Sequence, residues 1–244
     1  SYGCFNSGKF PVHKLFIQNN IFHPKDVFLF CLVLTCHDNL ILIFKNNIIM
    51  SGIKLKDIST RAGKEFDKQD TKNETIKILE ELNDLQNLLF AENKHSILIV
   101  IQAMDAGGKD GVVRNVFTSM NPQGVTVKSF KAPTAEELSH DFLWRVHLHA
   151  PAKGMIQIFN RSHYEDILIT RVNKWCDDET ANKRMKAIND WEELIVNHNN
   201  THILKFYLHV SREEQQERLN ERIKDPSKMW KYNENDLSEA KLWD

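Results

Sequence analysis

The segment 102–111 combines residue types that bind phosphate. Gly107 and Gly108 let backbone N–H groups curl around an anion, and Lys109 adds a positive charge at the same place. An unbroken apolar run at 97–101 precedes the segment, which is typical of a strand buried on both faces. A predicted helix follows, and its N-terminus favours negative charge. The order strand, glycine loop, lysine and helix therefore predicts a phosphate site.

The segment departs from the strict P-loop pattern Gly-x-x-x-x-Gly-Lys-Ser/Thr at two positions. Ala103 stands at the first position and Asp110 at the last, so the hydroxyl that usually contacts Mg²⁺ is missing. A carboxylate must then bind the metal, and Asp105 lies in the loop itself, which makes it the better candidate of the two aspartates. The alternative is a glycine-rich turn that binds nothing, in which Asp105 only caps the turn.

Strands and helices alternate along the chain around this segment. We predict strands at 97–101, 125–130, 155–160 and 202–210, and helices at 71–91, 112–120, 134 to about 148, 164–172, 180–198, 211–222 and from about 236. This alternation indicates an α/β fold, an open, doubly wound parallel sheet with helices on both faces. Ligands of such sheets bind at the carboxyl ends of the strands, where the loop and the Asn160–Arg161 pair both fall.

Length and composition are those of one α/β domain, with or without an appendage. The 244 residues carry a net charge of −1, so a polyanion must be bound by a local basic track. The four cysteines show neither metal nor disulfide spacing, which favours a reducing compartment and a cytoplasmic location. The longest apolar run has about ten residues, against roughly twenty for a membrane span. His140, His147 and His149 do not form a zinc pattern.

Residues 1–49 differ in composition from the rest of the chain. Apolar runs at 27–36 and 40–44 are interrupted by polar residues, and no helical or strand period persists. We interpret 1–49 as an extension outside the main domain, under the hypothesis that Met50 is the true start and the preceding residues are an artefact of gene prediction. Peptides from upstream of Met50 in the native protein would refute this hypothesis.

Six blocks of sequence follow one another in order along the chain, namely Gln102–Gly111, Asn121–Gly124, Ser129–Pro133, His140–Arg145, Phe159–Glu165 and Asp225–Lys231. Together these blocks resemble the polyphosphate kinase type 2 family. The resemblance covers 50–244 and implies a P-loop kinase-like three-layer α/β/α domain with a helical lid at about 212–234. Relative to the family, a C-terminal strand and helix are expected to be missing.

The resemblance also implies the reaction. A phosphoryl group would pass between inorganic polyphosphate and nucleoside mono- or diphosphates, with Mg²⁺ as cofactor. Asn160 followed by His163, Tyr164 and Glu165 is similar to the subgroup that accepts both AMP and ADP, whereas the more widespread version has aspartate at position 160. Adenine and guanine nucleotides and a second copy of the chain are expected partners, and neither nucleic acid nor membrane is expected.

Four residues are predicted to carry the chemistry. Lys109 neutralises phosphate charge, Arg161 binds the transferring oxygens with its planar fork, and Asp105 and Glu165 are the predicted metal ligands. The alternative is that Arg161 and Glu165, which are four residues apart, form only an ion pair on the surface of a helix. His163 is interpreted as a packing or solvent-facing residue.

A wider set of residues is predicted to contact phosphate or nucleotide, either in the loop or on a basic track. These residues are Ala106, Gly107, Gly108, Lys109, Asp110, Gly111, Arg114, Lys128, Lys131, Asp141, Arg145, Asn160, Arg171, Arg218, Arg222, Lys228 and Lys231. The basic residues at 218–231 belong to the lid, or else only to a solvated helix face. Two rival functions stay open, namely an ATP-dependent kinase of a nucleotide or small metabolite and an inactive polyphosphate- or nucleotide-binding fragment.

Overall fold

The computed structural model describes residues 40–44, 55–61, 67–226 and 229. Several sequence predictions concern residues outside these ranges. They are the apolar run at 27–36, the start at Met50, the last helix from about residue 236, and the lid residues Lys228 and Lys231.

Within the described residues, five strands form one sheet in the order β1-β5-β2-β4-β3. Their bounds are Leu40–Phe44 (β1), Ser96–Ala103 (β2), Val125–Ser129 (β3), Ile156–Asn160 (β4) and Thr201–His209 (β5). Strand β2 pairs in parallel with β4 and β5, and β3 pairs in parallel with β4. The predicted parallel sheet is therefore confirmed for four strands, with β2 in its middle.

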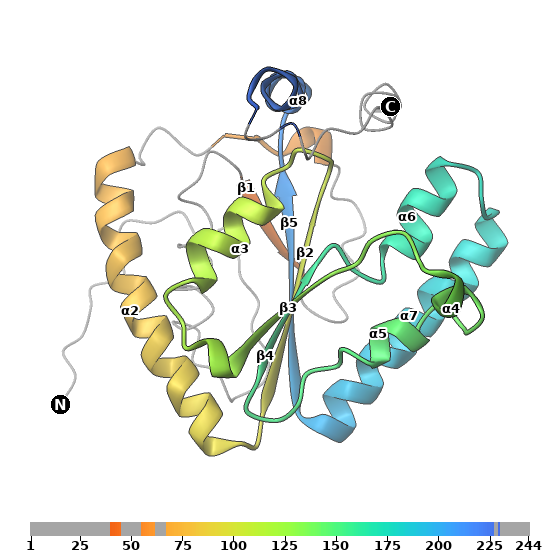
Figure 1. Cartoon of the computed structure of the whole chain (residues 1–244), viewed down its shortest axis with the longest axis horizontal. Coiled ribbons are helices and arrows are strands. Elements are labelled where there is room, and N and C mark those ends of the chain that lie inside the picture. Colours follow the sequence, from red (N-terminus) through yellow and green to blue (C-terminus); the bar gives the residue numbers. More distant parts are fainter. Residues whose placement is uncertain (1–39, 45–54, 62–66, 227–228, 230–244) are drawn as a thin grey trace.

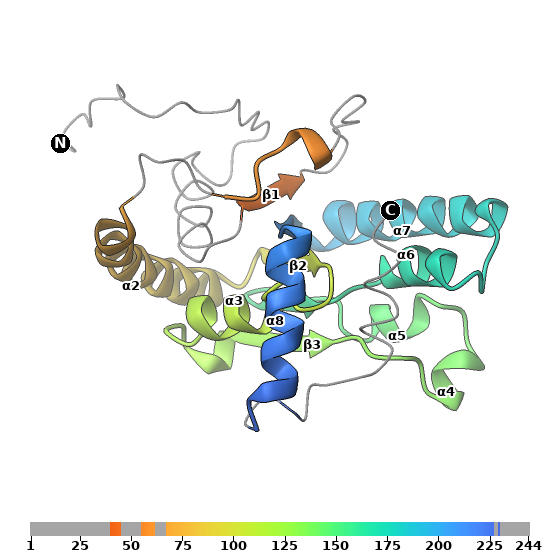
Figure 2. The ribbon, with the colours of Figure 1, turned by 90° about the horizontal axis from the view of Figure 1, so that it is seen from above.

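Helices cover both faces of this sheet (Figure 1). Helices α2 (Lys68–Glu92) and α3 (Lys109–Phe117) lie on one face, and α4 (Ala135–Leu138), α5 (Trp144–His147), α6 (Glu165–Val172) and α7 (Asp178–Asn199) lie on the other. Helix α8 (Arg212–Lys224) crosses the carboxyl ends of the strands, as the view from above shows (Figure 2). Short 3₁₀ turns occupy Leu55–Asp57 and Pro122–Gly124.

Strand β2 forms part of both hydrophobic cores. Ile99 and Ile101 belong to the cluster with α2 and α3, whereas Leu98 and Val100 belong to the cluster with Trp191 of α7. The four β2 side chains are at most 1% exposed. A strand packed on both faces has no alternation of apolar and polar residues, which explains its unbroken apolar sequence. It also gives the loop at its carboxyl end a rigid base.

Three sequence predictions need correction. Residues 40–44 were expected to have no regular structure, but they form the edge strand β1, which pairs antiparallel with β5. One helix was expected from 134 to about 148, but the chain forms α4 and α5. The break has a local cause, because the Asp141 side chain accepts a hydrogen bond from the N–H of Leu143 and starts a new turn. Helix α3 begins at Lys109, three residues earlier than predicted, and ends at Phe117.

The domain boundary predicted between residues 49 and 50 remains a prediction. It separates β1 from the other strands in sequence, although β1 lies beside β5 in the sheet.

Candidate active site

The loop after β2 is a tight turn followed by the start of α3. The N–H of Gly107 donates to the carbonyl of Met104 over 2.9 Å, and Ala106 has a φ of 58°. A β-carbon at Gly107 would lie 2.6 Å from Cβ of Ala103 and 2.7 Å from the carbonyl oxygen of Met104. Glycine is therefore required at 107, because no side chain fits between the turn and the end of β2.

Backbone N–H groups in this loop are available to an anion. Within the described residues, the N–H groups of Ala106 and Gly108 donate to no protein group. Gly108 precedes α3 with a φ of 94° and caps it without a side chain, so the positive end of the helix is open at the same place. Both features favour binding of phosphate.

Lys109 points back toward the end of β2 and is buried. Its Nζ donates to the carbonyls of Ala103 (2.8 Å) and Met104 (3.2 Å). Burial and then the nearby charge of Arg161 lower the pKa of Lys109 from 10.5 to about 8, against the opposing effect of nearby carboxylates. The ammonium group is thus held in a poorly solvated position where an additional anion would stabilise its charge.

Arg161 follows β4 and links the loop to α6. Its Nη2 lies 2.5 Å from Oδ1 of Asp105, and its Nη1 lies 4.0 Å from Oε2 of Glu165. The backbone of Arg161 has a φ of 64°, which is a strained conformation for a residue with a side chain. Its N–H donates a hydrogen bond to the carbonyl of Ile101 on β2. The structure therefore brings together three of the four predicted catalytic residues, with Arg161 between Asp105 and Glu165. Their catalytic roles remain a prediction.

Asn160 and Asp110 also meet across the site. The Asn160 side-chain amide donates to Oδ1 of Asp110 over 2.9 Å. Asp110, Asp105 and Glu165 are all close enough to Lys109 to oppose the lowering of its pKa. Burial raises the pKa of Glu165, and Arg161 acts against that shift.

The carboxylates fit a magnesium ion. Asp105 and Glu165 converge on one guanidinium beside the phosphate-binding loop, and both offer the oxygen ligands that Mg²⁺ prefers. Within the described residues there is no group of three or more metal-binding side chains. In the usual magnesium site of phosphoryl-transfer proteins, one or two carboxylates and the substrate phosphates share the metal.

Sequence reasoning missed a layer of side chains beneath the site. Gln102 donates to Oγ of Ser162 over 2.8 Å, and Ser162 accepts a hydrogen bond from the N–H of Tyr164. These bonds hold the start of α6 against the end of β2. No motif indicated the bond between Gln102 and Ser162, because these residues are 60 positions apart and become neighbours only through the pairing of β2 with β4.

A buried polar network lies behind this layer. Glu192 is 3% exposed, and its carboxylate accepts hydrogen bonds from Lys205 Nζ (2.5 Å) and Tyr164 Oη (2.9 Å) and lies 3.2 Å from Nε2 of His163. Burial lowers the pKa of His163, which keeps the ring neutral at pH 7. His163 is fully buried, as the packing interpretation expects.

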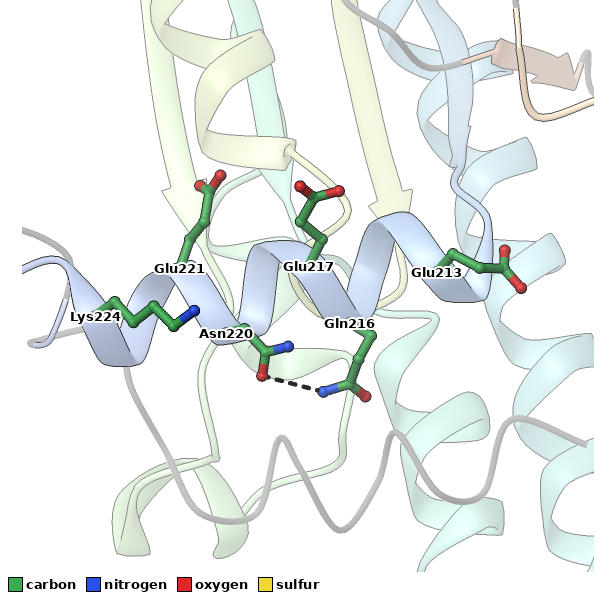
Figure 3. A pocket seen from close by; sticks show the side chains of 6 residues that line it. All are labelled: Glu213, Gln216, Glu217, Asn220, Glu221 and Lys224. Carbon is green, nitrogen blue, oxygen red and sulfur yellow. Dashed lines mark hydrogen bonds between the residues drawn. The ribbon is translucent and has the colours of Figure 1, made fainter.

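Helix α8 contacts the loop through two side chains. The Gln215 amide donates to the carbonyl of Asp105 over 2.9 Å, and Arg218 Nη1 donates to the carbonyl of Ala106 over 3.3 Å. The predicted lid residue Arg218 thus lies at the loop, where it also pairs with Glu214. The opposite face of α8 lines a shallow hollow with three glutamates, two amides and one lysine, and the loop is not part of it (Figure 3).

Other residues of the predicted basic track are engaged elsewhere. Arg145 is 6% exposed, donates to the carbonyl of Lys131 and pairs with Asp166. Arg171 is paired with Asp178 at 2.5 Å. Arg145 therefore organises the chain around Lys131 in this structure, and phosphate binding by either arginine remains a prediction.

Three further basic residues of the predicted set lie on different elements. Lys128 lies 5.9 Å from the ring of Phe130, Arg114 is exposed on α3, and Arg222 lies on α8. A β-carbon at Gly111 would meet nothing within 4 Å, so the structure requires glycine at 107 but not at 111.

The fold and the site together define a class of protein. A buried parallel strand leads into a glycine loop and a lysine at the start of a helix, and the guanidinium of Arg161, which follows the neighbouring strand β4, faces this loop together with the carboxylates of Asp105 and Glu165. This arrangement defines a P-loop kinase-like domain. No helix in the described part of the chain has the length and apolarity to cross a membrane.

Comparison with known proteins identifies the family. The sequence profile described as "Polyphosphate kinase 2 (PPK2)" matches residues 65–244, and the chain belongs to this family. An AMP/ADP-polyphosphate phosphotransferase of Meiothermus ruber is 47% identical over 191 residues, which span 74% of this chain and 71% of the relative. An ADP-polyphosphate phosphotransferase of Rhodopseudomonas palustris is 46% identical over 178 residues, 68% of this chain and 61% of the relative.

A solved structure gives the same result. The polyphosphate kinase 2 of Arthrobacter aurescens TC1 is 38% identical and superimposes with a TM-score of 0.70, covering 83% of this chain and 71% of that chain. The similarity thus extends beyond the loop to most of the fold.

Proposed function

We propose that this protein transfers a phosphoryl group between inorganic polyphosphate and AMP or ADP. Family membership supports the donor, and the names of the two relatives support the acceptors. The single observation that carries the proposal is the convergence of Lys109, Arg161, Asp105 and Glu165 at the carboxyl ends of β2 and β4.

The reaction breaks a terminal phosphoanhydride bond of polyphosphate. A new bond forms between the transferred phosphorus and a terminal phosphate oxygen of the nucleotide, and the polyphosphate leaves one unit shorter. Such transfer passes through a loose transition state and depends on positioning and on neutralising charge. Lys109 and the N–H groups of Ala106 and Gly108 suit this task at the donor phosphates, and the Arg161 fork suits it at the transferring oxygens.

Asp105 and Glu165 would hold Mg²⁺ in this proposal. The ion neutralises phosphate charge and orients the two substrates when it is bound. Arg161 contacts both carboxylates in the structure, so it orients them toward the same side of the loop. The proposal also includes guanine nucleotides as acceptors, a homo-oligomeric assembly, a cytoplasmic location and closure of the 212–234 segment over the phosphates.

The donor distinguishes the proposal from its rivals. Purified full-length protein with Mg²⁺ should convert ADP to ATP when long-chain polyphosphate is added, and AMP to ADP under the same conditions. An enzyme that phosphorylates AMP only with ATP as donor would be the rival kinase. A protein that binds polyphosphate but forms no new nucleotide with either donor would be the rival binding fragment.

A further inference from the structure

The turn at the centre of the loop has an uncommon geometry for its sequence. Residues Met104–Gly107 form a β-turn closed by the Gly107 hydrogen bond, and the third residue, Ala106, has positive φ while Asp105 does not. Among β-turns, a positive φ at the third residue alone is characteristic of type II, which favours glycine or asparagine at that position. Alanine at that position is strained, and a type I turn would relieve the strain by rotating the Asp105–Ala106 peptide.

Helix α8 supplies the contact that opposes this rotation. The side chain of Gln215 is 2% exposed, and its amide nitrogen donates to the Asp105 carbonyl. Because the partner is a carbonyl oxygen, the contacting atom must be the amide nitrogen. Rotating the peptide would remove this acceptor and leave a buried amide without its partner.

The orientation of this peptide decides which group faces the loop. The N–H of Ala106 and the carbonyl of Asp105 point in opposite directions across one planar peptide. With the carbonyl directed at Gln215, the N–H is directed away from α8 and has no protein partner among the described residues. After rotation, a carbonyl oxygen would replace this N–H and would repel a phosphate.

We propose that Gln215 is a positioning residue for phosphoryl transfer, which selects the turn conformation that presents the Ala106 N–H to phosphate. The inference rests on the proposed function for its activity assay. Gln215 does not contact the reacting atoms in this account, and acts through the backbone of the loop. Arg218 supports the next peptide through the Ala106 carbonyl.

Four variants of the full-length protein test this role. Gln215→Leu removes the side-chain amide that donates the hydrogen bond and replaces it with an apolar side chain of similar size. Gln216→Leu makes the same change at the exposed neighbouring residue, which pairs within α8 with Asn220 (Figure 3). Ala106→Gly makes the type II turn intrinsically favourable, so the double variant Ala106→Gly/Gln215→Leu no longer needs the Gln215 contact.

Steady-state kinetics with polyphosphate and ADP should separate the variants. Gln215→Leu should lower kcat about tenfold, on the scale of one hydrogen bond, whereas Gln216→Leu should stay within about twofold of wild type. The double variant Ala106→Gly/Gln215→Leu should have a kcat less than about threefold below that of Ala106→Gly alone. If Gln215 only stabilised the fold, Gln215→Leu would lower the melting temperature and Ala106→Gly would not restore kcat. An equal loss of kcat on adding Gln215→Leu to the wild type and to Ala106→Gly would therefore overturn the inference.

Binding of tripolyphosphate separates this inference from the proposed function. If wild-type protein shows no transfer, the proposed function fails, and calorimetry still tests the loop. Gln215→Leu should then weaken tripolyphosphate binding about tenfold, and glycine at 106 should restore it. Unchanged binding by Gln215→Leu would overturn the inference on its own.

Discussion

Burial of a charged Lys109 should make the protein less stable than a variant that carries methionine there, and the difference should depend on pH. Lys109 is 9% exposed, and its pKa is lowered from 10.5 to about 8. Burial is the larger cause of this shift, and the charge of Arg161 is the second. Methionine keeps the length of the side chain and removes the charge. The comparison therefore isolates the cost of holding an ammonium group in the loop.

The direction of the effect follows from proton binding. Between pH 8 and 10.5 the unfolded chain keeps the Lys109 proton and the folded chain has released it, so the stability of the wild type rises with pH in this window. The pKa falls by about 2.5 units, from 10.5 to about 8. This shift corresponds to about 3 kcal/mol of unfolding free energy. The full cost of burying the charge is present below pH 8 and is absent above pH 10.5.

Urea denaturation of both proteins measures this difference. The free energy of unfolding of the wild type minus that of Lys109→Met should increase by about 3 kcal/mol as the pH rises from 7.5 to 10.5. Other titrating groups act on both proteins and cancel in the difference. A difference that stays constant over this range, or that decreases with pH, would refute the claim that the structure holds Lys109 at a depressed pKa.

Four further results are expected. Gly107→Ala should lower activity by at least about tenfold and destabilise the fold by about 1–3 kcal/mol, because its Cβ would lie 2.6 Å from Cβ of Ala103, and circular dichroism melts would show the loss. Gly111→Ala meets no atom within 4 Å and should instead stabilise α3 by about 0.5–1 kcal/mol, so a comparable loss in both variants would contradict the steric argument. Arg161→Lys should reduce kcat about a hundredfold, since ammonium cannot replace the fork that contacts Asp105, and near-normal turnover would exclude a direct role for the guanidinium. Raising salt should weaken long-chain polyphosphate binding more than ADP binding in a filter assay, and equal weakening would argue against an extended basic track.

Local patterns predicted most of the central sheet and the loop. The apolar run of β2 and the glycines beside Lys109 indicated a buried strand followed by a glycine turn and a helix, and these are present. Phosphate binding by the turn stays a prediction. The capping box at Thr134 marked a helix start correctly, because both of its hydrogen bonds lie within four residues. The same reasoning did not predict the helix break near Asp141, where the side chain accepts a hydrogen bond from the N–H of Leu143.

Contacts between distant residues could not be predicted in this way. The strand at 40–44 is stabilised by pairing with β5, which lies more than 150 residues further along the chain. The bond from Gln215 to the Asp105 carbonyl spans 110 positions and needs α8 to cross the end of the sheet. The family resemblance placed Arg161 near the loop but gave no sign of its 2.5 Å contact with Asp105.

Polyphosphate-driven synthesis of ATP by matched samples of wild-type protein and Lys109→Met tests the central claim most directly. Both proteins should be folded, and only the wild type should convert ADP to ATP with polyphosphate and Mg²⁺, at a rate at least about a hundred times that of the variant. Equal ATP formation by the two proteins would show that the loop after β2 does not hold the transferring phosphates.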